Sequence, residues 1–310
     1  MSGTIAPADE TELLAAITDA VARRSPLSIA GGGTKTAVGR PVAAPVLSMA
    51  RLTGVTLYEP AEMTISALAG TPLAEIEAIL DAKGQALAFE PPDFRALLGT
   101  AGAPTIGAIA AANLSGPRRI MAGACRDALI GLRFVNGRGE AIRAGGRVTK
   151  NVTGLDLVKL QAGAWGTLGP LVETTFKALP RAEAAATVAL DGLDDVRAVA
   201  ALAAALGSPL EISGAAHLPA SVRGGAGALT LARLEGFAPS VAERRDKLLA
   251  LLRAHGTSRP LEDAEAAAHW REIRGATPLA EPRDRAVWRA SVPPSKGPGF
   301  VAAATAGAAS

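Results

Sequence analysis

Apolar positions in residues 9–24 recur with the spacing of an amphipathic helix. The residues that share its apolar face are Leu13, Leu14, Ile17 and Val21. Asp9 or Thr11 can cap the N-terminal end, and two arginines stand at the C-terminal end, where the helix dipole favours cations. The pattern therefore predicts one capped helix near the start of the chain.

Shorter apolar runs follow, and most have the length of strands. The expected strands span residues 26–30, 44–50, 64–70, 129–136, 139–145 and 171–179. The two runs around the Gly-Arg-Gly at 137–139 read as a hairpin. Residues 71–84 read as a helix with Pro72 near its start and Gly84 after its end. Short strands with few long helices predict an α+β fold.

The second half of the chain has a simpler order of expected strands and helices. It reads as strand 186–192, helix 193–207, strands 210–218 and 227–236, helix 240–256 and strand 286–293. This β-α-β-β-α-β order is that of a ferredoxin-like domain. Pro180 and the alanine-rich stretch after it mark a boundary. We therefore expect one domain over residues 1–182 and a ferredoxin-like α+β cap domain over residues 183–310.

Composition excludes several classes of protein. The 310 residues are 49% hydrophobic and carry a net charge of +3, with the basic residues dispersed, so we expect no nucleic-acid partner. One cysteine, Cys125, permits no internal disulfide and no self-contained iron–sulfur or zinc-thiolate site. His217, His255 and His269 form no metal-binding pattern, so no metal site is expected. The chain has no signal-peptide pattern and no apolar run of about 18 residues, so we expect no direct membrane insertion.

A glycine-rich stretch, SIAGGGTKTAVGRP at residues 28–41, carries the first chemical signal. A nucleoside-triphosphate loop needs a glycine where Thr34 stands, and both that loop and a dinucleotide fingerprint open a helix. Gly39 and Pro41 leave no room for one. A plain turn needs fewer glycines, each of which costs folding entropy. We interpret the stretch as a strand–loop–strand grip whose backbone amides approach a pyrophosphate, with a hydroxyl and an ammonium beside them.

Two further motifs follow in order, PTIGAIAAANLSGPRR at 104–119 and GAWGTLGPLVETTFKALP at 163–180. The triplet resembles the FAD-binding domain of the vanillyl-alcohol oxidase (PCMH-type) family over residues 1–182. The resemblance implies a two-subdomain FAD-binding domain ahead of the cap domain. It also implies FAD that is held non-covalently, because no histidine lies in residues 1–182.

The resemblance assigns cofactor-binding residues to all three motifs. Small residues would admit the extended cofactor, Asn113 and Ser115 would offer hydrogen bonds, and Gly116 would permit a positive φ. The alternative for the second motif is an Ala/Gly-rich packing helix. The residues expected to bind FAD are Gly31, Gly32, Gly33, Thr34, Lys35, Pro104, Thr105, Gly107, Ala110, Asn113, Ser115, Gly116, Gly166, Gly169 and Leu171.

Residues 113–119 and 123–169 are also similar to the FAD-binding E subunits of bacterial glycolate oxidases, and the similarity covers the whole FAD-binding domain and, more weakly, the stretch through Pro294. That resemblance implies an FAD-dependent oxidoreductase that oxidises glycolate and similar 2-hydroxy acids to 2-oxo acids. It implies a larger FAD-binding subunit and an iron–sulfur subunit as partners, which accept the electrons. It further implies a cytoplasmic protein that reaches the inner membrane only through those partners. Two alternatives stay open, a non-catalytic FAD-binding structural subunit and a stand-alone FAD-dependent alcohol oxidase.

The catalytic residues are not identified by the sequence. A 2-hydroxy acid needs a cation for its carboxylate and a base for its hydroxyl proton. The candidates are His269, Arg271 and Arg274 in the cap domain and Arg118, Arg119 and Arg126 beside the second motif.

Three features of the later chain qualify the resemblance. Lys150, Asn151 and Asp156 read as a hydrogen-bonded turn that supports the flavin. Leu155 stands where the family has a tyrosine. After Pro294, we expect the family's last cap segment to be missing or divergent.

Overall fold

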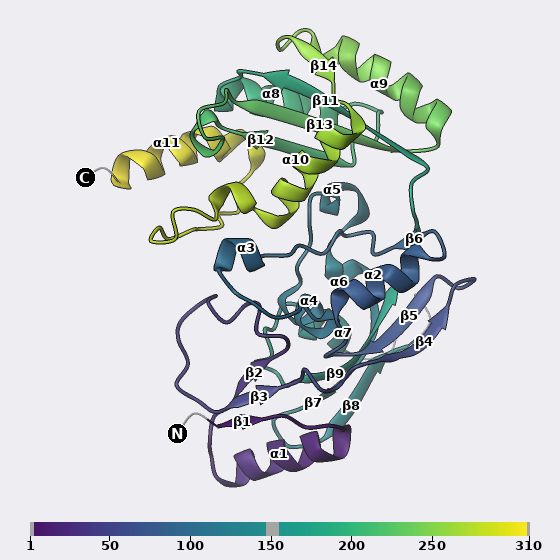
Figure 1. Cartoon of the computed structure of the whole chain (residues 1–310), viewed down its shortest axis with the longest axis vertical. Coiled ribbons are helices and arrows are strands. Elements are labelled where there is room, and N and C mark those ends of the chain that lie inside the picture. The colour runs from purple at the N-terminus through teal and green to yellow at the C-terminus, as the bar shows by residue number, and fades with distance from the viewer. Residues whose placement is uncertain (1–2, 147–154, 309–310) are drawn as a thin grey trace. The chain divides into compact units, whose positions relative to one another are not determined.

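The computed structural model describes residues 3–146 and 155–308, which form two compact units. The first unit comprises Met1–Gly116 and Gly123–Arg181, and the second comprises Pro117–Ala122 and Ala182–Ser310. Figure 1 shows the elements of both units in chain order. Each unit has its own buried apolar clusters, so each is described by itself.

A small parallel sheet and one helix form one layer of the first unit. The sheet order is β1 (Thr4–Ile5), β3 (Val46–Ser48), β2 (Ser28–Ala30). Helix α1 (Glu10–Ala22) begins after Asp9, whose side chain accepts a hydrogen bond from the backbone N of Glu12 at 2.9 Å. Leu13 and Ile17 of α1 pack into a buried cluster that also contains β3. The predicted N-terminal helix and its Asp9 cap are confirmed.

A five-stranded antiparallel sheet forms the larger part of the first unit. Its order is β4 (Val55–Glu59), β5 (Thr64–Leu68), β9 (Leu171–Lys177), β7 (Leu129–Val135), β8 (Ala141–Gly145). The β7–β8 hairpin and strands β5 and β9 are as predicted. The remaining elements of the unit are α2 (Leu73–Asp81), β6 (Gln85–Ala86), α3 (Arg95–Leu98), α4 (Ile106–Ala112), α6 (Cys125–Ala128), α7 (Leu157–Gln161) and β10 (Leu179–Pro180).

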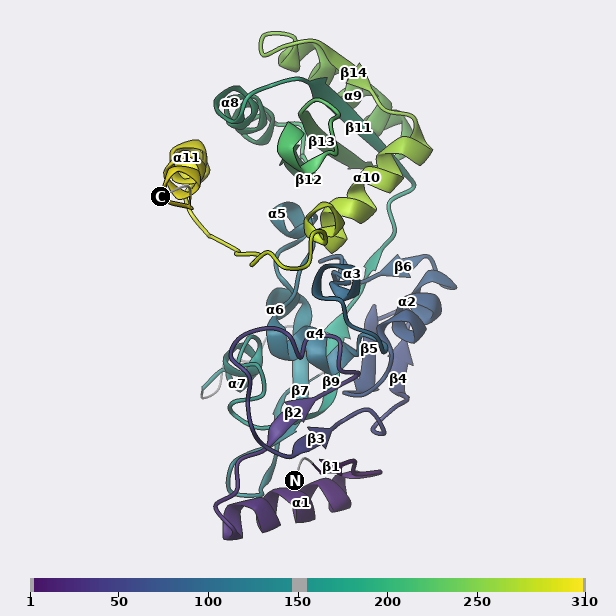
Figure 2. The same ribbon diagram turned by 60° about the vertical axis from the view of Figure 1, so that its left-hand side comes forward.

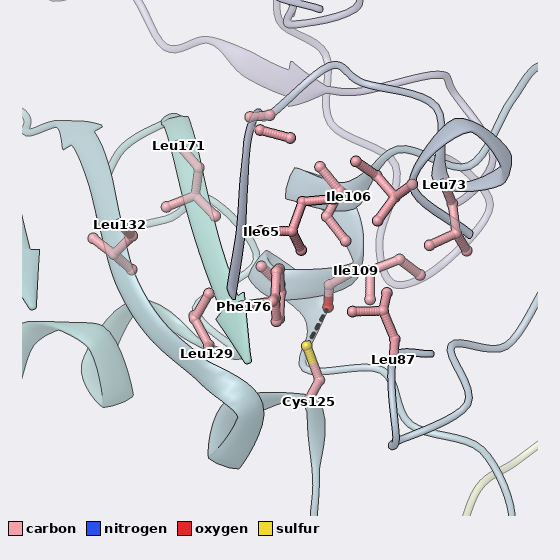
Figure 3. Close-up of a cluster of buried hydrophobic side chains, with 14 of the residues drawn as sticks. Ile65, Leu73, Leu87, Ile106, Ile109, Cys125, Leu129, Leu132, Leu171 and Phe176 are labelled. Atoms are coloured by element: carbon pink, nitrogen blue, oxygen red, sulfur yellow. Dashed lines mark hydrogen bonds between the residues drawn. The ribbon is translucent and has the colours of Figure 1, made fainter. Parts of the chain in front are cut away.

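The core of this unit lies between the large sheet and helix α4. Figure 3 shows Ile106 and Ile109 of α4 directed toward Phe176 of β9. The rings of Phe89 and Phe176 lie 5.7 Å apart, and both side chains are fully buried. Because α4 carries part of the second motif, this core fixes the motif on the sheet.

Cys125 is part of the same core. Its thiol Sγ lies 3.7 Å from the carbonyl oxygen of Ile109, to which it donates a weak hydrogen bond (Figure 3). Burial raises the pKa of the Cys125 thiol well above its usual range, and the nearby Asp127 carboxylate acts in the same direction. The reactive thiolate is therefore scarcely populated.

The second unit is a ferredoxin-like α+β domain, in agreement with the predicted fold class. Its sheet has the order β12 (Gly214–Leu218), β13 (Leu229–Gly236), β11 (Ala184–Asp191), β14 (Ser258–Pro260), and all pairs are antiparallel. Helices α8 (Asp195–Leu206) and α9 (Ala238–Leu252) pack on one buried cluster, and α10 (Asp263–Gly275) packs on another. The short elements are α5 (Arg119–Ala122) and the 3-10 turns η1 (Ala220–Val222), η2 (Thr277–Leu279) and η3 (Pro294–Lys296).

The predicted last strand of this domain is wrong. Residues 286–293 belong to no strand or helix in the described structure, and Trp288 is 88% exposed. The fourth strand is β14, a Ser-Arg-Pro segment that pairs with β11. Three mostly polar residues carry no apolar alternation, so the apolar run at 286–293 gave the stronger strand signal.

The end of the described chain is helical. Residues 286–293 lead to α11 (Gly297–Ala308), as Figure 2 shows. Within residues 3–146 and 155–308, every helix is too short or too polar to cross a bilayer.

Candidate cofactor-binding site

A cavity of about 550 Å³ opens in the first unit. Its volume lies within the range of about 300–1,000 Å³ that is typical of small-molecule sites. Three segments far apart in sequence line it, together with Ala69. The lining residues are Ser28–Thr36, Val38, Arg40–Val42, Val46, Met49, Ala69, Thr105, Gly107, Ala108, Ala111, Ala112, Trp165, Gly166, Pro170 and Leu171.

The first wall is the glycine loop, residues 31–36, which follows β2. No helix begins between β2 and β3, and the chain passes through turns to Pro41 and then into β3. The predicted strand–loop–strand arrangement is therefore confirmed.

Two of the three glycines are required by close contacts with residues 103–105, a backbone carbonyl for Gly32 and a side-chain hydroxyl for Gly31. A Cβ on Gly32 would lie 1.9 Å from the carbonyl oxygen of Ala103, and one on Gly31 would lie 2.3 Å from Oγ1 of Thr105. Gly33 instead has a φ of +74° and no atom within 4 Å of its Cβ position. The glycine loop thus lies directly against residues 103–105, and only Gly33 is there for its backbone conformation.

Helix α4 supplies the second wall. Thr105 precedes α4, and its Oγ1 is buried without a hydrogen-bond partner. Gly107 brings α4 close to Ala69, because a Cβ there would lie 2.5 Å from the Ala69 Cβ. Burying an unpaired hydroxyl costs free energy. A ligand in the cavity would provide the partner that Thr105 lacks.

The third wall lies between α7 and β9. Trp165 has a φ of 54°, its backbone N donates to the carbonyl of Ala111 at 2.9 Å, and its side chain is about half exposed. Gly166 follows with a φ of +78°. These two residues bring the chain after α7 against α4 and contribute to the cavity lining.

Two cations line the cavity, Lys35 and Arg40. Burial lowers the pKa of the Lys35 ammonium, and the Asp93 carboxylate partly opposes this shift. The hydrogen bond from Arg95 lowers the pKa of Asp93, so this carboxylate stays ionised. The Nζ of Lys35 lies 3.3 Å from Oγ1 of Thr34. An anion in the cavity would stabilise the charged form of Lys35.

The structure brings most of the predicted cofactor-binding residues together. Those that line the cavity are Gly31, Gly32, Gly33, Thr34, Lys35, Thr105, Gly107, Gly166 and Leu171. Pro104, Ala110, Asn113, Ser115, Gly116 and Gly169 are not among its lining residues. Ala110 is a buried core residue, and the carbonyl of Pro104 accepts from the backbone N of Leu73 at 2.8 Å.

The polar residues after α4 support the chain instead. Oδ1 of Asn113 accepts from the backbone N of Arg126 at 2.9 Å, and Oγ of Ser115 accepts from the backbone N of Cys125 at 2.8 Å. The positive φ expected at Gly116 is found at Asn113, with a φ of 48°. Position 116 requires a glycine because a Cβ there would lie 2.4 Å from the carbonyl oxygen of Glu90.

Gly169 has a similar supporting role at the start of β9. Its φ is +123°, and a Cβ there would lie 1.9 Å from the carbonyl oxygen of Val135. This glycine therefore permits close contact between the chain entering β9 and the end of β7.

Sequence reasoning missed Arg40, Trp165 and the apolar side chains of the loop and of β3. Arg40 and Val42 flank Pro41, whose own signal in the sequence is that no helix continues there. The signal available was their proximity in sequence to the glycine loop.

The catalytic candidates lie in the second unit, on or near α10. Nδ1 of His269 lies 3.3 Å from Oε2 of Glu272, and its Nε2 lies 4.0 Å from Oε1 of Glu265. Arg271 is exposed, and Arg274 is partly buried. Their role in catalysis remains a prediction.

The other polar candidates are held in local structure. Nε of Arg118 pairs with Glu235 at 3.1 Å. Arg119 begins α5, and the backbone of Arg126 bonds to Asn113 and Lys159. Asp156 caps α7 by accepting from the backbone N of Lys159 at 3.0 Å. Lys150 and Asn151 lie outside the described residues. No group of three or more potential metal ligands occurs among the residues that the structure describes.

Donor chemistry in the cavity fits a dinucleotide with a pyrophosphate. Backbone amides of the glycine loop, the Thr34 and Thr105 hydroxyls, Lys35 and Arg40 suit an anion. The apolar residues of the lining, among them Ile29, Met49 and Leu171, suit ring systems.

Comparison with known proteins agrees with this chemistry. The FAD binding domain family matches residues 1–145. The chain is 36% identical over 225 residues to glycolate oxidase subunit GlcE of Escherichia coli (strain K12), covering 71% of this chain and 62% of that protein. It is 30% identical over 186 residues to glycolate oxidase subunit GlcD of Bacillus subtilis (strain 168), which covers 59% of this chain and 38% of that protein. The chain thus spans less than two thirds of either relative.

Solved structures share the fold at low identity. Alkyldihydroxyacetonephosphate synthase superposes with a TM-score of 0.67 at 17% identity, over 88% of this chain and 54% of the other. p-Cresol methylhydroxylase superposes with a TM-score of 0.66 at 14% identity, over 90% of this chain and 62% of the other.

Proposed function

The chain belongs to the PCMH-type family of FAD-binding proteins, with FAD as cofactor, and we propose that it is the FAD-binding subunit of a complex that oxidises glycolate and similar 2-hydroxy acids. The observation that carries this proposal is the cavity whose walls combine the glycine loop, the unpaired Thr105 hydroxyl and Lys35. The names of the relatives support the substrate class. They include glycolate oxidase subunits, a D-2-hydroxyglutarate dehydrogenase and D-lactate dehydrogenases.

The proposed roles follow from the chemistry of each wall. Lys35 and Arg40 would neutralise the charge of the pyrophosphate, and the glycine-loop amides would donate hydrogen bonds to it. The Thr105 hydroxyl would donate to a phosphate or ring acceptor. The small residues Ala108 and Ala111 would admit a ring against α4. Bound FAD supplies a hydride acceptor for the oxidation of a CH–OH group.

Partner subunits form part of the proposal. The electrons need an acceptor, and one cysteine cannot hold an iron–sulfur cluster. We therefore propose a larger FAD-binding subunit and an iron–sulfur subunit as partners. A cytoplasmic location, with access to the inner membrane only through these partners, is proposed on the same grounds.

A non-catalytic role is the second candidate. Among the described residues, the cavity lining contains no His, Asp, Glu or Tyr that could serve as a base. In that case the chain would hold FAD and support a partner that carries the catalytic base. This observation also counts against a stand-alone alcohol oxidase.

Anaerobic reduction separates these candidates. Glycolate or D-lactate is added to the purified chain, alone and co-purified with the proposed partners, and the visible absorption of oxidised flavin is followed. Reduction of the isolated chain supports a catalytic subunit. Flavin that is bound but remains oxidised in both preparations would overturn the catalytic proposal, and a preparation free of flavin would overturn the site itself.

FAD affinity should fall at alkaline pH. Because burial lowers the pKa of Lys35, the free protein loses this charge below the ordinary lysine range. Binding of an anion must then take up a proton, so affinity decreases as pH rises through the lowered pKa. Lys35→Met should bind FAD about 10- to 100-fold more weakly at neutral pH, with no such decline.

Fluorescence titration with FAD across pH measures the effect. Lys83→Met, which removes an exposed lysine outside the cavity, is the control and should retain the wild-type slope. A Lys35→Met profile identical to that of the wild type would show that the ammonium does not contact the cofactor.

A further inference from the structure

The glycine loop is backed by a second stretch of chain, residues 93–105, which is called the backing segment below. A Cβ on Gly102 would lie 2.2 Å from the carbonyl oxygen of Gly32, and a Cβ on Gly32 would lie 1.9 Å from the carbonyl of Ala103. Oγ1 of Thr100 donates to the carbonyl of Thr34 at 3.0 Å. Backbone contacts on this scale leave the loop little freedom while the backing segment stays in place.

Arg95 holds the backing segment in that conformation. Its Nη1 donates to the carbonyl of Gly102 at 3.1 Å. Its Nε and Nη2 pair with the Asp93 carboxylate, the latter at 2.6 Å from Oδ2. Its own carbonyl accepts from the backbone N of Thr100 at 3.2 Å. The Arg95 side chain therefore links Asp93, at the start of the backing segment, to Gly102, which lies against the glycine loop.

Asp93 also links its ion pair with Arg95 to the Lys35 ammonium, which lines the cavity. Its carboxylate acts through space on the Lys35 ammonium, and it is the charged group that opposes the lowering of the Lys35 pKa by burial. Arg40 lies on the same cavity wall. The side chain of Arg95 does not line the cavity among the described residues, so any effect on the cofactor is indirect.

We propose that Arg95 is a positioning residue, which with Asp93 holds residues 100–103 against the glycine loop and so presets the loop for FAD. The inference rests on FAD occupying the cavity, as proposed above. A preset loop binds more tightly because less conformational freedom is lost on binding. The chemistry recognised is the pyrophosphate, and Arg95 affects it indirectly, through the backing segment and through the charge of Asp93.

Removal of the guanidinium gives two distinct readouts. Arg95→Gln should weaken FAD binding about 10- to 30-fold, because it breaks charge-assisted hydrogen bonds that hold the segment. The Asp93 carboxylate, released from Arg95, should then favour the Lys35 ammonium, so the alkaline decline in affinity moves to higher pH. Asp93→Asn should move that decline to lower pH. A purely structural role would not shift the two profiles in opposite directions.

Arg181→Gln is the matched control, because Arg181 forms an exposed ion pair with Asp81 in the same unit, away from the cavity. FAD titration and hydrogen exchange of amides 31–36 are measured for each variant. Weaker binding and faster exchange in Arg95→Gln, with Arg181→Gln unchanged, support the inference. Should Arg95→Gln not fold, Thr100→Val removes the bond to Thr34 and must weaken binding in the same way.

The outcomes separate this inference from the function on which it rests. Equal FAD affinity in the wild type and in Arg95→Gln, or in the wild type and in Thr100→Val, would overturn the positioning role alone. A wild-type chain that binds no FAD would overturn the site, and the positioning role with it.

Discussion

Gly32→Ala should bind FAD about 100-fold more weakly than the wild type, a loss of about 2.7 kcal/mol. The added Cβ would lie 1.9 Å from the carbonyl oxygen of Ala103. Backbone on both sides of the contact leaves no flexible side chain to move away, so the glycine loop or residues 102–105 must shift. Either shift moves the amides that face the cavity. Isothermal titration with FAD measures the loss directly.

Gly39→Ala is the control for backbone strain. Gly39 has a φ of +83° but no atom within 4 Å of its Cβ position, and it does not line the cavity. Its substitution should cost about 1–2 kcal/mol of stability through the left-handed conformation while FAD affinity stays near the wild-type value. Equal losses of FAD affinity in both variants would mean that strain, rather than the contact with Ala103, controls the site.

Phe176→Ala should destabilise the first unit by about 3–5 kcal/mol. The ring is 1% exposed and packs against Phe89 and α4, so its removal leaves a cavity and ends an aromatic contact (Figure 3). Urea unfolding followed by hydrogen exchange of peptides from β7 and β9 reports on this unit. Since the same core fixes α4, FAD affinity should fall with stability.

Phe237→Ala removes the same atoms from a side chain that is 76% exposed. Its free energy of unfolding should change by less than about 0.5 kcal/mol. A loss below about 1 kcal/mol in Phe176→Ala would contradict the described packing between β9 and α4.

The sequence predicts the helices and strands of this protein wherever the apolar residues of a segment recur with one regular spacing. Helix α1 has a helical apolar period and a capping aspartate, and the β7–β8 hairpin has a glycine turn between apolar runs. The fourth strand of the cap domain fails this condition, because β14 is a Ser-Arg-Pro segment without apolar alternation and its place is set by pairing with β11.

The glycine-rich motifs indicate the cofactor better than the roles of single residues. Gly31, Gly32 and Gly107 line the cavity, yet each is required by a neighbouring chain segment. Gly116 and Gly169 serve such contacts alone. A sequence shows that a glycine is present, whereas the atom that a Cβ would meet depends on segments distant in the chain.

Arg40 and Trp165 show the converse limit. Arg40 lies near the end of the glycine-rich stretch and Trp165 lies beside a glycine of the third motif. Their place in the lining follows from the course of the chain around Pro41 and from the positive φ at Trp165. Tertiary contacts of this kind carry no local period, so single-sequence reasoning misses them.

The inert thiol of Cys125 makes the natural chain a ready background for site-directed labelling. Because this thiol is the one cysteine of the sequence and is buried with a raised pKa, maleimide reagents should modify newly introduced cysteines selectively. Cysteines introduced and labelled at exposed Gly39 and exposed Phe237 would attach one reporter to each unit, and Cys125 would not have to be replaced. Distances between the two labels, measured with and without FAD, would then report whether cofactor binding restricts the movement of one unit relative to the other.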